Sequence, residues 1–310
     1  YFGIAMLLTG CVEEVDQFQP LELTSGNIER FFEAVQSNPL HKSWDASQEQ
    51  LITLPGSGRV IVPPNAFLLP DGATATGVVQ AKVLELYSKE DFLKNKVTTL
   101  GGNGFIESAG ALYFEVRQGD QLLRLKPGEL ITIQMASARY NSQMRLFTGK
   151  ESEAHGSIEW VEYSLGDAPI RSVQVEDPNT GALLPGFEFS SPELGFLKCG
   201  TYVAQEQGTA EICLNLPYSF EAANTVAFIA LRDYNGLAMI PFEAADALRP
   251  DCCQGRLPNG EPAKIVVIAE GEEGKYFLEQ KTVTITENLT ISITPETASL
   301  SDIMLALEGL

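Results

Sequence analysis

Near the start of the chain, apolar residues recur at helical spacing. Four of them fall at positions i, i+3, i+4 and i+7, namely Ile28, Phe31, Phe32 and Val35. Ser25 and Asn27 precede this stripe as candidate N-caps, and Asn38-Pro39 ends it. The pattern predicts one amphipathic helix that packs on the edge of the following domain, with docking of a partner protein as the alternative.

Beyond Gln48 the pattern changes to short β-rich runs that Gly, Pro, Asn and Asp residues separate. Up to Ser137 these runs are Leu51–Leu54, Arg59–Val62, Gly77–Tyr87, Ala111–Arg117, Leu122–Leu125 and Leu130–Ala136. After a connecting segment they are Ser172–Glu176, Phe187–Phe189, Glu211–Leu216, Thr225–Leu231, Ala263–Ala269, Lys275–Leu278, Thr282–Thr286 and Leu289–Ile293. Alternating apolar residues bury only one face of a sheet, so the runs predict an all-β protein of two antiparallel β-sandwiches.

The chain closes with the signature of a capped helix. Ser299 stands at the N-cap and Asp302 at N3, and one apolar face follows, made of Leu300, Ile303, Met304 and Leu307. We therefore predict four parts: 1–10 as the remnant of a signal peptide, 11–47 as an acidic tether with the first helix, 48–150 as the first sandwich, and 151–310 as the second sandwich with the C-terminal helix. With 310 residues, of which 44% are hydrophobic, the chain is long enough to bury two cores.

The first ten residues are uncharged and mostly apolar, and they are too short to span a bilayer as a helix. They lead into Leu8-Thr9-Gly10-Cys11, which resembles the lipobox of bacterial lipoproteins, where the cysteine receives a diacylglyceryl group. The resemblance implies that Cys11 is the lipidation site and that acyl chains hold the protein on a membrane. The alternative is a buried N-terminal strand with an incidental cysteine.

Acidic residues dominate the segment behind Cys11. From Val12 to Gln50 there are eight Asp or Glu and two Lys or Arg, which is typical of a solvated tether. Acidic residues next to the lipidated cysteine also resemble the export signals of some Gram-negative surface lipoproteins. The expected location is the outer membrane, lipid-anchored and exposed at the cell surface, with the periplasmic face as the alternative.

Turn and core residues of the first predicted sandwich carry a further resemblance. Gly58–Phe67, Asp71-Gly72, Thr76–Val78 and Gly104–Gly110 are similar to the ZU5-type β-sandwich module of bacterial surface lipoproteins. Phe189–Tyr202 resembles a segment that follows such modules. The resemblance implies an interaction domain, and we expect a second, Ig-like or transthyretin-like sandwich after it. No single binding residue can be carried over.

The remaining cysteines are Cys199, Cys213, Cys252 and Cys253. An exported protein matures where disulfides persist, and four thiols allow three pairings. We expect one or both of the adjacent pair to tie the loop around Pro250 back to Cys199 or Cys213. A zinc site is disfavoured, because no Cys-x-x-Cys is present and neither histidine lies near in sequence.

Composition and motifs argue against several chemistries. The formal charge is -20, from 21 Lys plus Arg against 41 Asp plus Glu, and this charge repels nucleic acid. A Ser-His-Asp triad is disfavoured for two reasons. The only histidines are His41 and His155, and the turns at Ser57 and Ser108 lack the glycines of a nucleophile elbow. Gly102–Glu107 lacks the third glycine and the βαβ setting of a dinucleotide site.

Carboxylates and tryptophans leave weaker candidates. Glu107 and Glu115 share side-chain parity, as a glycosidase pair would require. The acidic residues Glu270, Glu272 and Glu273 are predicted to form a solvated hairpin tip, with weak calcium binding as the alternative. Trp44 and Trp160 could stack on sugars, although Trp160 is better explained as a core anchor.

The sequence therefore predicts a non-catalytic envelope lipoprotein that acts as a binding or structural scaffold, without a cofactor or metal, and with an envelope protein or glycan as its partner. Recognition is assigned to the loops Pro70–Gly72, Leu100–Gly104 and Asp246–Pro258. One alternative is an accessory subunit that captures carbohydrate or protein for an outer-membrane transporter, which clustered exposed aromatic residues in a groove would favour. The other is a hydrolase, which requires a pocket with His155 or two close carboxylates.

Overall fold

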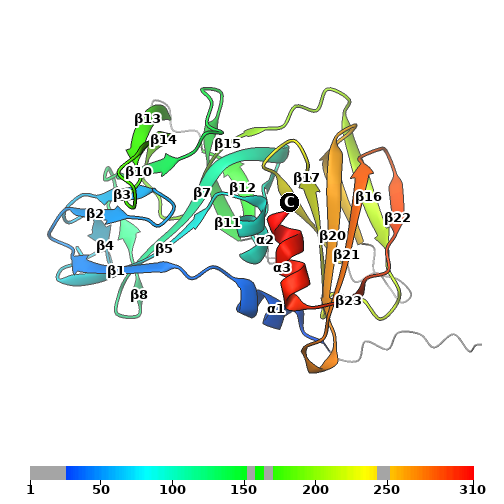
Figure 1. Ribbon diagram of the computed structural model, residues 1–310. Helices are drawn as coiled ribbons and strands as arrows, with labels where there is room; N and C mark the ends of the chain where they lie inside the picture. Colours follow the sequence, from blue (N-terminus) through cyan, green and yellow to red (C-terminus); the bar gives the residue numbers. More distant parts are fainter. Residues whose placement is uncertain (1–25, 152–157, 164–169, 243–251) are drawn as a thin grey trace, which may run out of the picture.

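Two β-sandwiches lie side by side, and three short helices fill the space between them (Figure 1). The computed structural model describes residues 26–151, 158–163, 170–242 and 252–310. Within these ranges the helical elements are α1 (Ile28–Val35), α2 (Lys89–Lys94), α3 (Leu300–Glu308) and the 3-10 turn η1 (Glu272–Gly274). The predicted all-β class, with one helix near each end, is confirmed. None of these helices is long and apolar enough to cross a bilayer.

The first sandwich packs a curved eight-stranded sheet against a five-stranded sheet. The larger sheet has the order β1 (Leu40–Asp45), β5 (Val78–Leu86), β7 (Gly104–Gln118), β15 (Gly195–Tyr202), β11 (Arg145–Glu151), β12 (Ile158–Glu162) and β6 (Leu100–Gly101), and β8 (Gln121–Leu122) also pairs with β7. The smaller sheet has the order β13 (Arg171–Glu176), β14 (Leu183–Ser191), β10 (Ile131–Ala136), β3 (Arg59–Val62) and β2 (Gln50–Thr53). The short strands β4 (Phe67–Leu68) and β9 (Arg124–Leu125) pair with each other.

Alternation along β10 shows why these strands form a sandwich. Ile131, Ile133 and Met135 are buried in the first core, while the residues between them are half-buried. Successive side chains of a strand point to opposite faces, so this period of two places one apolar face against the other sheet.

The second sandwich packs a three-stranded sheet against a five-stranded sheet. The former has the order β19 (Cys252–Pro258), β16 (Thr209–Asn215) and β22 (Leu289–Ser292), with β16 parallel to β22. The latter has the order β18 (Leu237–Ile240), β17 (Thr225–Leu231), β20 (Pro262–Glu270), β21 (Tyr276–Thr284) and β23 (Glu296–Ala298). Every residue of β17 is buried, because one face of its sheet lines the second core and the other faces the first sandwich.

The strands do not divide at residue 150, where the sequence placed the domain boundary. β11 to β15 complete the first sandwich, and the second begins with β16. The prediction failed because these strands pair with partners far away in the sequence, as Leu146 does with Cys199 and Ile133 with Phe189. The same cause placed β1 in the tether, although Leu40 to Asp45 pair with β5.

A third apolar core lies between the two sandwiches. It contains Leu86, Phe92, Ile106, Phe147 and Trp160 from the first, Phe228, Val266 and Ile268 from the second, and Phe31, Phe32, Ile303 and Leu307 from the outer helices. The stripe of α1 therefore packs against both sandwiches rather than on one edge. The predicted caps form: Asn27 accepts the N–H of Glu29, and Ser299 makes a capping box with Asp302.

Polar side chains join the sandwiches around this core. The Asn235 side-chain amide donates to the carbonyl oxygens of Tyr87 and Ser108 at 2.8 and 2.9 Å. The Arg256 guanidinium donates to the carbonyls of Gly101 and Gly102 at 3.1 and 3.3 Å. All four bonds run from the second sandwich to the first, so they help to fix the relative placement of the two sandwiches.

One lysine lies wholly inside the third core. Lys198 on β15 is 0% exposed, its Nζ is 3.7 Å from the centre of the Trp160 ring and 5.0 Å from that of Phe92, and it donates to the Thr98 carbonyl at 3.1 Å. The face of an aromatic ring attracts a desolvated ammonium group by about 2 kcal/mol, but removal of that group from water costs several kcal/mol. Burial therefore lowers the pKa of Lys198 well below its ordinary value of 10.5.

Candidate ligand-binding groove

The predicted glycosidase pair does not form. Glu107 and Glu115 both lie on β7, where Glu107 pairs with Thr201 and Glu115 with Lys82. Eight residues of extended strand span about 26 Å, whereas glycosidase carboxylates lie within about 10 Å of each other. Shared parity was therefore insufficient evidence for a pair.

Among the described residues, neither Ser57 nor Ser108 belongs to a catalytic triad. Ser57 sits in a tight turn with a φ of 67°, and the Ser108 hydroxyl is buried and accepts the N–H of Gly110. His41 is exposed on β1, and His155 lies outside the described residues. The described part of the chain thus gives Ser57 and Ser108 structural roles.

A pocket of about 220 Å³ does contain two carboxylates, Glu85 and Asp91. Glu85 accepts the N–H of Gly56 and the hydroxyl of Tyr87, each at 2.7 Å, and burial raises its pKa. Asp91 caps α2 by accepting bonds from Ser88 and Tyr87. Glu85 thus holds a turn in place, and Asp91 holds the start of a helix.

The hairpin tip between β20 and β21 differs from its prediction. Glu270 is 1% exposed instead of solvated, and burial raises its pKa. Its Oε1 lies 3.8 Å from the Arg30 guanidinium of α1. Glu272 and Glu273 remain exposed in η1. Glu270 therefore attaches α1 to the second sandwich and does not belong to an open cluster of carboxylates.

The structure brings two of the three candidate recognition loops together. Arg256 on β19 bonds to the loop Leu100–Gly104, and the Gln205 amide donates to Asn103 of that loop at 3.3 Å. Pro70–Gly72 lies instead beside β4 and Arg124. Residues 246–251 lie outside the described residues. The paired loops form a junction between the sandwiches, since their polar groups bond to each other.

A groove with a volume of about 390 Å³ lies on the first sandwich. β8 and β15 both pair with the same edge of β7, Leu122 opposite Arg117 and Gly195 opposite Phe114, and the groove opens between them. We call it the Tyr113 groove; it is lined by Tyr113–Glu115, Leu122–Leu125 and Pro192–Gly195. The exposed Leu122 and the half-buried Leu194 give it apolar walls.

A bonded network fixes the polar wall of the Tyr113 groove. The Tyr113 hydroxyl donates to Glu115 Oε2 at 2.6 Å, and Arg117 Nε donates to Glu115 Oε1. Burial alone would raise the pKa of Glu115, but the bonds from Arg117 and Tyr113 outweigh burial and lower it. A fixed, ionised carboxylate therefore lies beside an aromatic ring.

The Tyr113 ring is part of an aromatic chain that reaches into the third core. Its centre lies 4.6 Å from that of Phe196, and the Phe196 ring lies 6.2 Å from that of Trp160. This packing restricts the rotation of Tyr113, so the groove is largely formed before any ligand enters.

The sequence carries one local signal of this groove, which did not suffice to predict it. Tyr113, Glu115 and Arg117 alternate along the strand and so share its polar face. Glu193 and Leu194 come from a turn far along the chain, and no local pattern indicates that they meet β7. The two tryptophans that were weighed for sugar stacking are both buried, Trp160 as the predicted core anchor and Trp44 against Phe67.

No family model matches the chain, and no curated protein matches it. Among solved structures, the chain is similar to the crystal structure of wild type pneumolysin with a TM-score of 0.18 and 12% identity, over 84% of this chain and 88% of that one. Similarity this weak carries no argument about fold or function. The lipobox and ZU5-like resemblances stay predictions.

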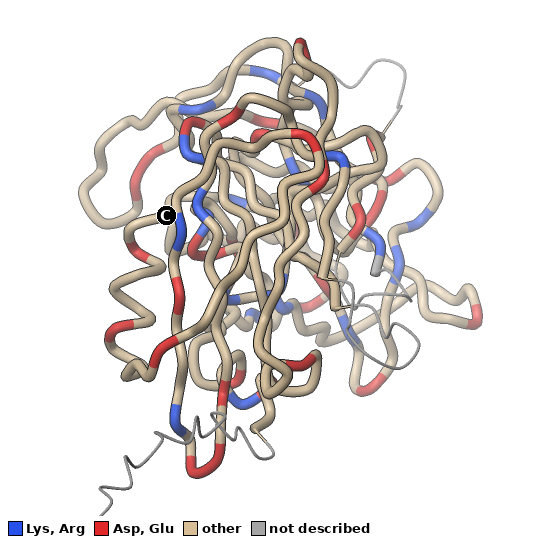
Figure 2. The backbone as a smooth tube through the Cα atoms, turned by 90° about the vertical axis from the view of Figure 1, so that its right-hand side faces the viewer, with Lys and Arg blue, Asp and Glu red and all other residues tan. Residues whose placement is uncertain are grey.

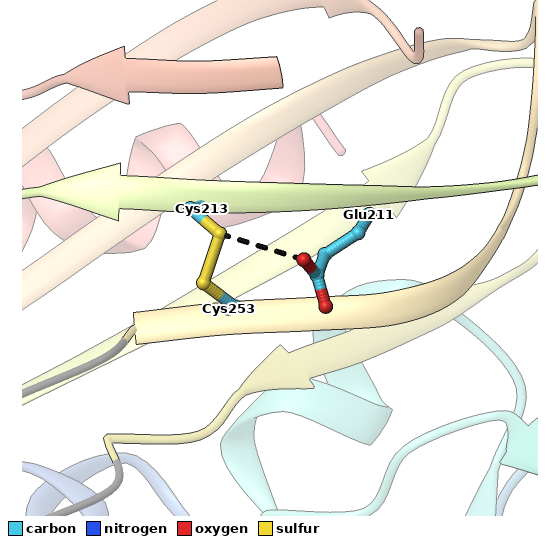
Figure 3. Close-up of side chains that lie close together, drawn as sticks. All are labelled: Glu211, Cys213 and Cys253. Atoms are coloured by element: carbon cyan, nitrogen blue, oxygen red, sulfur yellow. Dashed lines mark hydrogen bonds between the residues drawn. A yellow bond between two sulfur atoms is a disulfide. The ribbon is translucent and has the colours of Figure 1, made fainter. Parts of the chain in front are cut away.

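The structure joins Cys213 on β16 to Cys253 on β19 in a disulfide (Figure 3). These two belong to the four predicted disulfide candidates. Cys199 and Cys252 are buried and do not take part in this disulfide. Cys11 and the loop around Pro250 lie outside the described residues.

Charged residues are mixed over the side drawn in Figure 2. Among the described residues on that side, Lys and Arg positions are interspersed with Asp and Glu and do not gather in one stretch. The chain as a whole carries a charge of -20. This net negative charge disfavours a polyanionic ligand.

Proposed function

We propose that this chain is a non-catalytic, lipid-anchored binding scaffold of a bacterial cell envelope, and that it captures a short glycan in the Tyr113 groove. The observation that carries the proposal is the groove itself. It combines a packed aromatic ring, apolar walls and a fixed carboxylate, and small-molecule sites have this composition and size.

Aromatic and planar polar groups together suit a sugar. The CH face of a pyranose packs on an aromatic ring, while vicinal hydroxyls donate to a carboxylate or accept from a guanidinium. Tyr113, Glu115 and Arg124 offer these three functions along the Tyr113 groove. This arrangement favours carbohydrate capture over a purely structural scaffold.

Export is supported by the disulfide between Cys213 and Cys253, because disulfides persist in oxidising compartments. The anchor rests on the lipobox-like sequence that ends at Cys11. Mass spectrometry of the protein purified from native membranes should find an N-terminal peptide that begins at Cys11 and carries acyl chains. An unmodified peptide that still contains Tyr1–Gly10 would contradict the anchor.

Binding is tested with the purified chain on an array of oligosaccharides, followed by calorimetric titration of the strongest binder. We expect Tyr113→Ala to weaken binding by about tenfold or more, since the stacking and the hydrogen bond from Tyr113 to Glu115 are lost together. Tyr218→Ala is the matched control, because Tyr218 is an exposed tyrosine on the other sandwich.

Glu115→Gln keeps the shape of the side chain and removes its charge, so it provides a second test if Tyr113→Ala perturbs the sheet. Circular dichroism checks that each variant is folded. Absence of any glycan bound by the wild type, or equal binding by the Tyr113→Ala and Tyr218→Ala variants, would contradict glycan capture in this groove.

A further inference from the structure

We propose that Glu211, Cys213 and Cys253, when the two cysteines are thiols, form a three-ligand site for a thiophilic divalent cation such as Zn²⁺. The site lies on the outer face of the three-stranded sheet of the second sandwich. It does not depend on the Tyr113 groove.

Strand geometry brings the three ligand atoms together (Figure 3). Cys213 and Cys253 stand directly opposite each other on antiparallel strands, with Cα atoms 4.1 Å apart. Glu211 precedes Cys213 by two residues and so shares its face of the sheet. The Glu211 Oε2 lies 3.9 Å from the Cys213 Sγ, and all three ligand atoms lie within 4.8 Å of one another.

The local backbone leaves the site open. The pairing of β16 with β19 shifts register between Ala210 and Ile212, and Gly255 lies near Glu211. A Cβ atom at Gly255 would lie 3.7 Å from Glu211 Oε1, so a larger side chain there would occupy the space over the carboxylate. Glu211 is exposed and both sulfur-bearing residues are partly exposed, so an ion can enter from solvent.

The donor set suits zinc. Two thiolates and one carboxylate are ordinary zinc ligands, with bond lengths of about 2.3 and 2.1 Å, and water completes a tetrahedral shell. The buried thiols Cys199 and Cys252 are not part of the group. The sequence disfavours zinc because it contains no Cys-x-x-Cys and no histidine near the cysteines, whereas this site combines Glu-x-Cys on β16 with a cysteine of the paired strand β19.

Metal capture and disulfide formation compete for the same sulfurs. The disulfide forms when the two thiols lose two protons and two electrons to a disulfide-exchanging oxidant, whose own disulfide becomes a dithiol. Metal binding releases the same two protons and transfers no electrons, because both thiolates donate their pairs to the ion. The oxidised protein therefore excludes the metal.

The test uses the full chain, reduced with a phosphine that becomes a phosphine oxide by taking oxygen from water, and then freed of it. Titration with Cd²⁺ should give a thiolate-to-cadmium absorption band that saturates at one equivalent. The oxidised protein should give none. Glu211→Gln should weaken Cd²⁺ binding by about tenfold or more, and a double variant of Cys199→Ser and Cys252→Ser should bind as the wild type does.

Circular dichroism follows the fold during reduction. If the reduced chain loses structure, one equivalent of Cd²⁺ should restore it, since binding then drives folding. Equal Cd²⁺ affinity in the wild type and Glu211→Gln, a band that survives removal of both Cys213 and Cys253, or a reduced chain that takes up no Cd²⁺ would each overturn the proposal.

Discussion

Replacement of Trp160 by alanine is expected to lower the free energy of unfolding by about 3–5 kcal/mol, the usual cost of removing a large buried aromatic side chain. Trp160 is 0% exposed in the core between the sandwiches, and its Nε1 donates to the Thr98 carbonyl. Its ring also packs against Lys198 and Phe196. Urea unfolding followed by circular dichroism measures the change.

The two tryptophans provide a matched comparison through replacement by phenylalanine. Trp44 is also buried, but its Nε1 finds no hydrogen-bond partner among the described residues. Trp44→Phe therefore removes a buried N–H that costs about 1–3 kcal/mol, which offsets the lost volume, whereas Trp160→Phe breaks a bond and removes part of the ring over Lys198. Equal losses in the two variants would contradict this account of the third core.

Replacement of Lys198 by methionine is expected to raise the free energy of unfolding by about 1–3 kcal/mol at neutral pH. Methionine keeps most of the length of the chain and removes the group that is costly to bury. The Trp160 bond to Thr98 remains, because that carbonyl accepts from both side chains. Lys281→Met, on an exposed position of β21, is the control and should change little.

The pH dependence tests the cause of this gain. Because burial lowers the pKa of Lys198, the unfolded chain binds a proton that the folded chain does not bind between the lowered value and the ordinary 10.5. The stability of the wild type therefore rises with pH through this window. The advantage of Lys198→Met should shrink as pH rises and vanish above 10.5. A variant less stable than the wild type at neutral pH would show that the bond to Thr98 and the ring contacts outweigh desolvation.

Local patterns predicted those elements whose causes are local. Both outer helices were predicted, one from the apolar stripe between Ile28 and Val35 and the other from the Ser299 cap. Two strands have the predicted bounds, Arg59–Val62 and Thr225–Leu231. Short periodicities and capping residues act over a few positions, so sequence alone reveals them.

Pairings between distant segments were not predictable in this way. Lys198 lies in the middle of β15, and a lysine in a strand normally indicates a position that faces solvent. This strand is instead central in its sheet, because it pairs with β7 some eighty residues away. The domain boundary, the Tyr113 groove and the site at Glu211 all depend on such pairings. Their residue types were visible in the sequence, but their neighbours were not.

The most direct test of the central claim is hydrogen–deuterium exchange of the chain with and without the strongest glycan found on the array. We expect the glycan to slow exchange in peptides that contain residues 113–115, 122–125 and 192–195, and we expect Tyr113→Ala to remove this effect. Protection confined to other segments, such as the junction of Leu100–Gly104 with β19, would contradict the assignment of the binding site to the Tyr113 groove.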